Sequence, residues 1–497
     1  MTIYTQRNAS VFVQFQLGGP SYYLGDCLDL DNIPNPRFGG IDPIQCWNRK
    51  RTGFVTKGRK YSPPGLAEVT LTHLLENTAS WLEKVSCPFR LYAIKQSCGE
   101  AGVLKNWERA YVLNNVEITD DPVTQFAHHV DDNESMHEYT VVFDPPRVDI
   151  LRPRVARQTT TETDDILSIG VCGNRFCDDD CGPYTLPCDN VVMGAGGGVA
   201  TTANVQITQD GGNTWTAAAT DPFAVNLDIM SIACFEISKG VNRILVVRNS
   251  LTATPLQCRY SDNNGATWYP LVNIGSVNTE AVSGPKGLFA LDANHIWVAT
   301  NQGNIYFSSD GGATWTLQAS AAVASGGNVL NAIYAVDENV VFAVGDTDTI
   351  IYSQNGGDDW YAAGATGSSL NLLSVMAWNK WHILVGAENP AGAASLYMTY
   401  DGGDNWETRS YVGGTAESVV DMDFGARFGA PNVGYIATNT SGPVGSIHMT
   451  IDGGYTWEEL AVPANSGLTS LVMCDVDEFF AAGNINSATG LILHGAA

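Results

Sequence analysis

The sequence predicts a mainly β protein in two parts: an N-terminal β-sandwich or β-barrel carrying one helix, then a seven-bladed β-propeller closed by strands from both its ends. Three observations lead to this prediction. The 497 residues exceed the ~100 to 250 residues of one ordinary domain. A motif ending in tryptophan recurs six times after residue 200, and the charge balance changes near residue 160.

The repeated motif reads TQDGGNTW, SDNNGATW, SSDGGATW, SQNGGDDW, TYDGGDNW and TIDGGYTW. Successive copies lie 53, 47, 45, 46 and 51 residues apart, because their tryptophans are Trp215, Trp268, Trp315, Trp360, Trp406 and Trp457. A period of this length, with β-rich sequence between the copies, favours four-stranded propeller blades.

The number of blades follows from the apolar strands between the motifs. Seven such segments occur: VVMGAGG, ILVVRN, IWVATNQG, VVFAVGDT, HILVGAEN, GYIATNT and FFAAGNIN. The last unit supplies three strands, so we expect its fourth strand to come from before the first blade, around Val155 to Asp165. Such closure protects the edges of the sheets. The predicted domains are therefore residues 1–155 and 156–497.

The six motifs resemble the Asp box, Ser/Thr-x-Asp-x-Gly-x-Thr-Trp, also called the bacterial neuraminidase repeat, over about residues 165–497. The resemblance implies that each motif is the turn between the third and fourth strands of a blade. An Asp or Asn side chain accepts hydrogen bonds from N–H groups of its own turn, glycine supplies positive φ, and we expect tryptophan to fill the gap against the next strand. The Asp position is occupied by Asp210, Asn263, Asp310, Asn355, Asp401 and Asp452.

The two asparagines at this position argue against a general acid or nucleophile there, so we predict structural turns and no catalytic residue. Proteins with Asp boxes include sialidases, which need three arginines around a substrate carboxylate. The chain offers few arginines after Asp165 and no RIP triplet before the first motif, so a sialidase is not expected. A glycoside hydrolase or lyase that uses two carboxylates stays the alternative, with candidate acids at Asp337, Glu388, Asp421, Asp423, Asp475 and Asp477.

The charge distribution excludes other classes of function. The net charge is -26, of which residues 1–160 carry -1 and the remainder carries -25. Such an acidic surface repels phosphate backbones, so we expect no sequence-specific nucleic-acid binding. No segment has the ~18 apolar residues of a membrane span, and the start lacks a signal-peptide pattern, so synthesis in a cytoplasm without membrane insertion is expected. No motif calls for a cofactor.

The 11 cysteines cannot all pair within one chain, because their number is odd. Eight are candidates for disulfides: Cys27, Cys46, Cys87, Cys98, Cys172, Cys177, Cys181 and Cys188. The last four form a cluster whose spacing fits no familiar zinc site, so they are weak candidates for metal ligands. Disulfides or free thiols are the favoured prediction.

The first 155 residues have another pattern. Strand-like segments (SVFVQFQLGG, GFVTKG, EVTLTHL, FRLYAIKQ, AYVLNNVEIT and EYTVVFD) surround one predicted helix, LTHLLENTASWLEKV, whose apolar residues recur at helical spacing. This layout, with segments such as YYLGDCLDLDNIPNPRFGGIDPIQCW and VSCPFRLYAIKQSCG, resembles the tail tube (major tail) proteins of long-tailed bacteriophages. The resemblance implies a subunit of stacked hexameric rings.

These observations lead to one functional hypothesis: a structural virion protein of the tail, made in the host cytoplasm. Its first part would self-assemble into homo-hexameric rings, and its propeller would be displayed outside and bind a cell-surface glycan or a protein. Besides the carboxylate hydrolase, a bacterial interaction scaffold that grips one protein partner is the remaining alternative.

Overall fold

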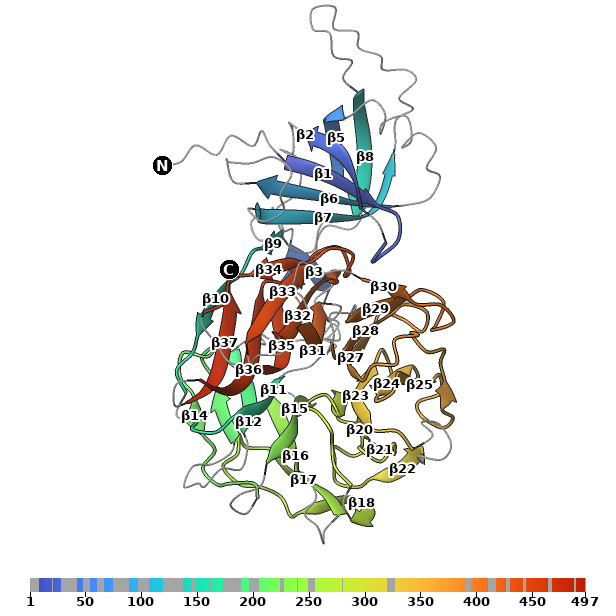
Figure 1. Ribbon diagram of the computed structural model, residues 1–497. Coiled ribbons are helices and arrows are strands. Elements are labelled where there is room, and N and C mark those ends of the chain that lie inside the picture. The colour runs from blue at the N-terminus through green and yellow to red at the C-terminus, as the bar shows by residue number, and fades with distance from the viewer. Residues whose placement is uncertain are drawn as a thin grey trace, which may run out of the picture. The chain divides into compact units, whose positions relative to one another are not determined.

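The computed structural model describes residues 9–19, 21–27, 43–47, 54–59, 67–74, 89–96, 107–118, 137–144, 149–160, 162–172, 189–195, 205–223, 228–238, 240–248, 255–278, 280–319, 327–389, 395–409, 417–425, 430–440, 444–463, 467–486 and 489–496. The chain forms two compact units, Met1–Arg152 and Pro153–Ala497 (Figure 1). Each unit is built from antiparallel strands.

The first unit is a closed β-barrel. Its strands are β1 (Ala9–Gln14), β2 (Ser21–Cys27), β5 (Ala67–Leu74), β6 (Phe89–Gln96), β7 (Trp107–Ile118), β8 (His137–Asp144) and β9 (Asp149–Leu151), with β3 (Pro43–Trp47) and β4 (Phe54–Arg59) forming a separate hairpin. The order is β6-β1-β2-β5-β8-β7-β9, and β6 also pairs with β7. That extra pairing closes the barrel, because it joins the first strand of the row to the sixth.

The predicted helix is wrong at its start. Leu71–Leu74, assigned to the helix by their apolar spacing, end strand β5 and pair with β8. Short apolar runs fit either period, and the neighbouring strand decides between them. The rest of that segment lies outside the described residues, which contain no α-helix, and none that could span a membrane.

The second unit consists of seven four-stranded sheets, numbered here along the chain. Sheets 1 to 4 contain β11 (Ile166–Val171), β12 (Val191–Ala195), β13 (Val205–Thr208) and β14 (Thr216–Ala217); β15 (Ile229–Ser238), β16 (Val241–Arg248), β17 (Pro255–Ser261) and β18 (Val272–Asn278); β19 (Leu288–Asp292), β20 (His295–Ala299), β21 (Ile305–Ser308) and β22 (Thr316–Ala319); and β23 (Leu330–Ala335), β24 (Val341–Gly345), β25 (Thr349–Ser353) and β26 (Tyr361–Ala362).

The remaining sheets follow the same order of strands, apart from the seventh. Sheets 5 to 7 contain β27 (Leu372–Ala377), β28 (Ile383–Ala387), β29 (Leu396–Thr399) and β30 (Glu407–Thr408); β31 (Glu417–Gly425), β32 (Ala430–Thr440), β33 (Gly445–Thr450) and β34 (Glu458–Leu460); and β35 (Leu468–Asp475), β36 (Glu478–Asn486), β37 (Thr489–Ala496) and β10 (Arg154–Arg157).

The first strand of each sheet lies beside the first strand of the next. These inner strands touch in the order β11, β15, β19, β23, β27, β31 and β35, and β35 touches β11 again. The sheets therefore stand in a ring around a common axis, as the ribbon shows from green to red (Figure 1). This is the arrangement of a β-propeller.

The ring closes through a strand that precedes the first sheet. β10 pairs with β37, with Arg154 opposite Ala496 and Arg157 opposite Leu493. The sequence placed this strand around Val155 to Asp165, and the paired segment covers only the beginning of that range. Sheet 7 thus combines one strand from before sheet 1 with three strands from the end of the unit.

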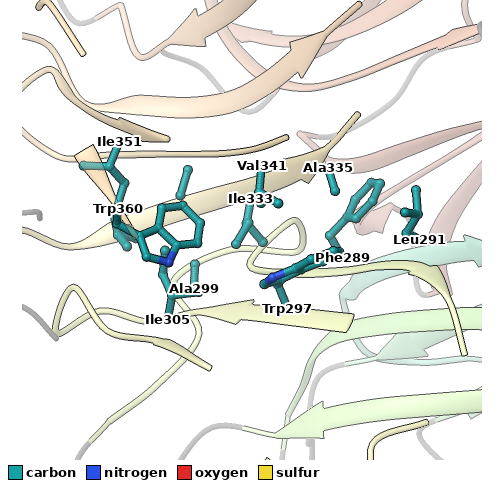
Figure 2. Close-up of a cluster of buried hydrophobic side chains, with 12 residues drawn as sticks. Phe289, Leu291, Trp297, Ala299, Ile305, Ile333, Ala335, Val341, Ile351 and Trp360 are labelled. Carbon is teal, nitrogen blue, oxygen red and sulfur yellow. The ribbon is translucent and has the colours of Figure 1, made fainter. Parts of the chain in front are cut away.

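The apolar core lies between neighbouring sheets. Figure 2 shows the junction of sheets 3 and 4, where Trp297, Ile305 and Phe289 pack against Ile333, Val341 and Trp360. The middle strands read as continuous apolar runs, such as IWVA in β20 and VFAVG in β24, because neighbouring sheets cover both of their faces. Equivalent clusters fill the junctions of sheets 1 and 2, 2 and 3, 4 and 5, 5 and 6, and 7 and 1.

A disulfide joins Cys172, just after β11, to Cys234 in β15. Cys172 is therefore in a disulfide and is no metal ligand, and its partner Cys234 was not among the eight candidate cysteines. Cys474 is disulfide-bonded as well, while Cys258 is a buried free thiol. The side chains of the other seven candidates lie outside the described part of the chain, where no pairing is assigned.

Replacing both Cys172 and Cys234 by serine should lower the free energy of unfolding by about 4 kcal/mol, because the bridge closes a loop spanning 62 residues. Denaturant unfolding without reductant, followed by tryptophan fluorescence, measures the difference. Cys258→Ser serves as a matched control, since it removes a thiol without opening a loop. An unchanged transition in the double variant would contradict the bridge.

Candidate functional site

The six tryptophan motifs form six nearly identical turns, named here the glycine turns. Each joins the third and fourth strands of a sheet, in sheets 1 to 6. In the turn of sheet 3, Asp310 Oδ1 accepts the Thr314 N–H at 2.8 Å and the Ser308 hydroxyl at 2.9 Å. The Ser308 hydroxyl in turn accepts the Gly312 N–H at 2.9 Å. The Asp310 side chain is thus fully engaged in holding its own turn.

The same two acceptors recur in every glycine turn. The oxygen at the Asp or Asn position accepts the N–H four residues ahead at 2.8 to 3.0 Å, in Asp210, Asn263, Asp310, Asn355, Asp401 and Asp452. An amide oxygen accepts this bond as well as a carboxylate does. The geometry explains why asparagine substitutes for aspartate in sheets 2 and 4.

A second contact inside the turn distinguishes asparagine from aspartate. Asp210, Asp310 and Asp452 accept a threonine hydroxyl four residues ahead, and Asp401 accepts the Asn405 amide. In sheet 4 the direction is reversed, because Asn355 Nδ2 donates to Asp359 Oδ2 at 2.9 Å. The pairs Asp401–Asn405 and Asn355–Asp359 therefore exchange donor and acceptor while keeping one hydrogen bond.

The turn carboxylates differ in their acidity according to burial. Hydrogen bonds from the side chain and backbone of Asn405 lower the pKa of Asp401 to about 2. The side chain and backbone of Thr214 likewise lower the pKa of Asp210. Burial instead raises the pKa of Asp452, against the same kind of hydrogen bonds. None of these groups has the free, exposed carboxyl that proton transfer to a substrate would need.

Each turn tryptophan packs against the preceding sheet, not against the next strand as predicted. Trp360 of sheet 4 lies among residues of sheet 3 (Figure 2), and Trp215 of sheet 1 meets Phe480 of sheet 7 edge to face at 6.2 Å. The glycine at the middle of the turn faces the same side: at Gly312, φ is 86° and a Cβ would lie 2.9 Å from Leu245 of sheet 2. A side chain there would collide with the neighbour.

The one junction without a turn tryptophan is that of sheets 6 and 7, because sheet 7 has no glycine turn among its described residues. There Tyr435 of β32 and Phe479 of β36 pack with their ring centroids 4.6 Å apart. The Tyr435 hydroxyl donates to the Val476 carbonyl at 2.9 Å, so its buried polar group has a partner.

The acids proposed for a hydrolase do not converge on one place. Asp337 and Glu388 accept backbone N–H groups of Asn339 and Asn371, and Asp475 accepts that of Val476. Asp423 links two sheets by accepting the Met473 N–H at 2.9 Å. Asp477 is buried beside Tyr435, whose pKa is raised by burial and then by this carboxylate. These carboxylates therefore stabilise turns and contacts between strands.

Asp421 is the exception, because it belongs to a charged cluster at the axis of the ring. Lys286, which precedes β19 in sheet 3, extends to sheets 6 and 7, the two sheets farthest from it around the ring. Its Nζ donates to the Leu471 carbonyl at 2.9 Å and lies 3.4 Å from Asp421 Oδ2. The same carboxylate oxygen accepts the Leu471 N–H at 2.6 Å. This cluster, Lys286 with Asp421 and Leu471, is called the axial pair below.

Opposing effects act on the pKa of the Asp421 carboxyl group in the axial pair. Asp421 is completely buried, and this desolvation raises its pKa, while the Lys286 ammonium and two backbone N–H groups act to lower it. Lys286 keeps 25% of its side chain exposed. A lysine and a single carboxylate, both already bonded to backbone, lack a second free acid or base for hydrolysis.

Hydrogen bonds between inner strands hold the sheets together around the axial pair. In four places a side chain near the start of one inner strand donates to a backbone carbonyl of the neighbouring inner strand. The pairs are Ser168 to Ile229, Asn331 to Leu372, Ser374 to Val419 and Thr469 to Ile166. Ser231 bonds to the Pro285 carbonyl, and the Ile333 N–H donates to the Lys286 carbonyl at 2.9 Å. Lys286 is therefore fixed by the sheets on both sides of it.

The end of the ring opposite the glycine turns contains buried acids that sequence reasoning missed. Glu280 accepts Thr300, Asn304 and Tyr306, each at 2.8 Å, and Glu417 accepts Thr438 at 2.7 Å with His448 at 3.3 Å. The signal was the repeated Ala-Thr-Asn at 299–301 and 437–439. Lys286 had a signal too, since Lys239, Lys286 and Lys380 are the three lysines after residue 160.

No group of three or more His, Cys, Asp or Glu side chains within the described ranges is arranged to hold a metal ion. Among the weak metal candidates, Cys172 is in a disulfide, and Cys177, Cys181 and Cys188 lie outside those ranges.

Comparison with known proteins gives structural matches alone, since no protein-family model and no curated protein matches the chain. The solved structure "YCF48 bound to D1 peptide" is 17% identical, with a TM-score of 0.49 over 69% of this chain and 95% of that chain. YCF48 from Cyanidioschyzon merolae is 15% identical, with a TM-score of 0.48 over 69% and 98%. The GH74 xyloglucanase from Xanthomonas campestris is 11% identical, with a TM-score of 0.49 over 68% and 53%. All three are β-propellers, but at these identities and TM-scores the assignment depends on the sheets described above.

Asn355→Asp should destabilise the protein by about 1 kcal/mol, because it sets a carboxylate against Asp359 where an amide now donates. Asn263→Asp in sheet 2 is the matched control and should be neutral, since the Thr267 hydroxyl can rotate to donate. Adding Asp359→Asn to the first variant recreates the pair of sheet 5 and should restore stability. Thermal unfolding at neutral pH measures all three, and equal effects of the two Asn→Asp variants would refute this account.

Lys286→Met should lower the free energy of unfolding by about 3 kcal/mol at neutral pH, because Asp421 then lacks a counter-ion in a buried site. Without the ammonium, the folded pKa of Asp421 rises further above its unfolded value. The deficit should therefore be smallest at acidic pH, where the carboxyl is neutral, and grow as pH rises. Denaturant titrations across pH measure this. Lys380→Met, at an exposed lysine between β27 and β28, is the control, and a pH-independent deficit would contradict the ion pair.

Proposed function

We propose that residues 153–497 form a seven-bladed Asp-box propeller that binds a ligand but does not catalyse a reaction. The propeller is attached to an N-terminal assembly domain. The observation that carries this proposal is the use of the acidic side chains. The turn aspartates, Asp421 and the candidate acids Asp337, Glu388, Asp423 and Asp475 accept hydrogen bonds from their own turns or from neighbouring strands. A hydrolase needs two carboxylates facing a substrate, and none of these acids is arranged in that way.

The ion pair at the centre of the ring favours the outer surface as the place where a ligand binds. Lys286 crosses the centre and is bonded at its far end to Asp421 and Leu471. Propeller enzymes use the centre of the ring for their substrates, and here that place holds an ion pair. The ring is also fixed by the β10–β37 ladder and by a disulfide, which suits a rigid module for display.

The role of the first unit follows from the sequence layout. We propose that it self-assembles into hexameric rings stacked as a tail tube of a virion, with the propeller outside. The barrel strands other than β9 pair with neighbours on both sides, although β2 and β5 are joined by the single pair Gly25–Leu74, so assembly would proceed mainly through loops and side chains.

The full-length chain should form rings or tubes of about six-fold symmetry in negative-stain images. It should release no reducing ends from neutral or acidic polysaccharides. Particles that stay monomeric at high concentration would refute the tail-tube role and leave a scaffold. Turnover that Asp421→Asn or Asp423→Asn abolishes, without loss of folding, would establish the hydrolase instead.

A further inference from the structure

Two tyrosines in sheet 2 form a stacked pair at the outer rim. Tyr260 in β17 and Tyr269, just before β18, have ring centroids 4.5 Å apart and planes inclined by 25°. Tyr260 packs against the apolar cluster between sheets 2 and 3, while Tyr269 remains 45% exposed. The outer ring thus presents a flat apolar surface to solvent, backed by the inner one.

The stack is held rigidly from beneath. The Arg243 guanidinium lies 4.1 Å from the centroid of Tyr260 and 5.9 Å from that of Tyr269. It donates to both oxygens of Asp262, at 2.6 and 2.7 Å, and to the Gly311 carbonyl of the next sheet at 3.1 Å. Both rings are already held in place before a ligand binds. A stacking ligand would therefore lose little affinity to the entropy cost of ordering these side chains.

Sheet 4 has a looser tyrosine pair at equivalent positions, with its ring planes inclined by 37°. Tyr352 and Tyr361 are opposite each other in the β25–β26 ladder, with centroids 5.8 Å apart, and Tyr361 is 52% exposed. In both sheets the two tyrosines lie three residues before and six residues after the turn asparagine, Asn263 or Asn355. The other four turns have no tyrosine at either position.

We propose that Tyr269 and Tyr361 are two subsites for a neutral polysaccharide, each stacking on one pyranose ring. This inference rests on the proposed binding function and names its ligand class. The C–H groups of a sugar face pack on an aromatic ring, and its hydroxyls remain free to bond with polar neighbours. Two subsites on one rigid ring engage one polymer chain, which multiplies the two weak contacts.

The charges around the stack select a neutral ligand. The cation-binding face of Tyr260 is already covered by Arg243, so a cationic ligand gains little there. Arg243 is itself neutralised by Asp262, and the -25 carried by residues 161–497 repels polyanions. The other exposed large apolar side chains described on sheets 2 to 4 are aliphatic, namely Val241, Leu271 and Leu317. Tyr269 and Tyr361 are therefore the two that offer a ring face to a sugar.

Affinity electrophoresis of the full-length chain in gels with hydroxyethylcellulose, galactomannan or dextran tests the inference, with polygalacturonate as the anionic probe. At least one neutral polymer should retard the wild type. Tyr269→Ala should raise the dissociation constant about tenfold, and Tyr269→Ala/Tyr361→Ala should raise it further. Tyr269→Phe should bind like the wild type, because the ring is kept.

Trp381→Ala is the matched control, since Trp381 is also 52% exposed but lies in the turn between β27 and β28 and belongs to neither tyrosine pair. Its retardation should equal that of the wild type. The inference is overturned if no neutral polymer retards the wild type, if polygalacturonate alone does, or if the double variant is folded and retarded normally. Cleavage of a retarded polymer would refute the proposed function instead, while leaving the subsites to be judged by the tyrosine variants.

Discussion

The ring of sheets depends on the short ladder between β10 and β37. The apolar clusters described in the second unit lie between neighbouring sheets, so the apolar packing of each sheet comes from the sheets beside it. A row of this kind has two open ends unless its last sheet meets its first. Arg154–Arg157 joins sheet 7 from the N-terminal side and so ties the start of the chain segment to its end. The axial pair joins sheet 3 to sheets 6 and 7 across the axis, so it depends on this closure to keep the opposite sheets in place.

The arrangement of sheets could be predicted because its signals are local. Asp310, Gly312 and Trp315 carry out hydrogen bonding, a tight approach and packing within eight residues, and their repetition marks each sheet. The direction in which the tryptophans pack could not be predicted, because a turn does not specify which neighbour it faces. The same limitation explains the helix expected from Leu71, since pairing with β8, distant in sequence, sets the conformation of that segment up to Leu74.

The candidate site was predicted less well, for a physical reason. The turn acids are held by neighbours in sequence, so their structural role can be inferred from residue type. Lys286 and Asp421 meet across the axis although they are far apart in the chain, and neither has a distinguishing local pattern. The pairing of Cys172 with Cys234 was not predicted either, because the two cysteines are 62 residues apart and only the packing of sheets 1 and 2 brings them together. The sequence alone did not predict the tyrosine pairs, because strand register decides that Tyr352 lies opposite Tyr361.

The closing ladder also determines how the ring responds to mechanical load. Arg154 is paired with Ala496, so a pull applied between these two residues acts at one end of an antiparallel ladder. The hydrogen bonds then open one pair after another, as in a zipper, and never share the load. A pull applied through the rim, at Tyr269 or Tyr361, acts on sheets that are bonded to neighbours on both sides, and it is spread around the whole ring. A ligand held at the rim would therefore load the strong direction of the module and spare its weak one.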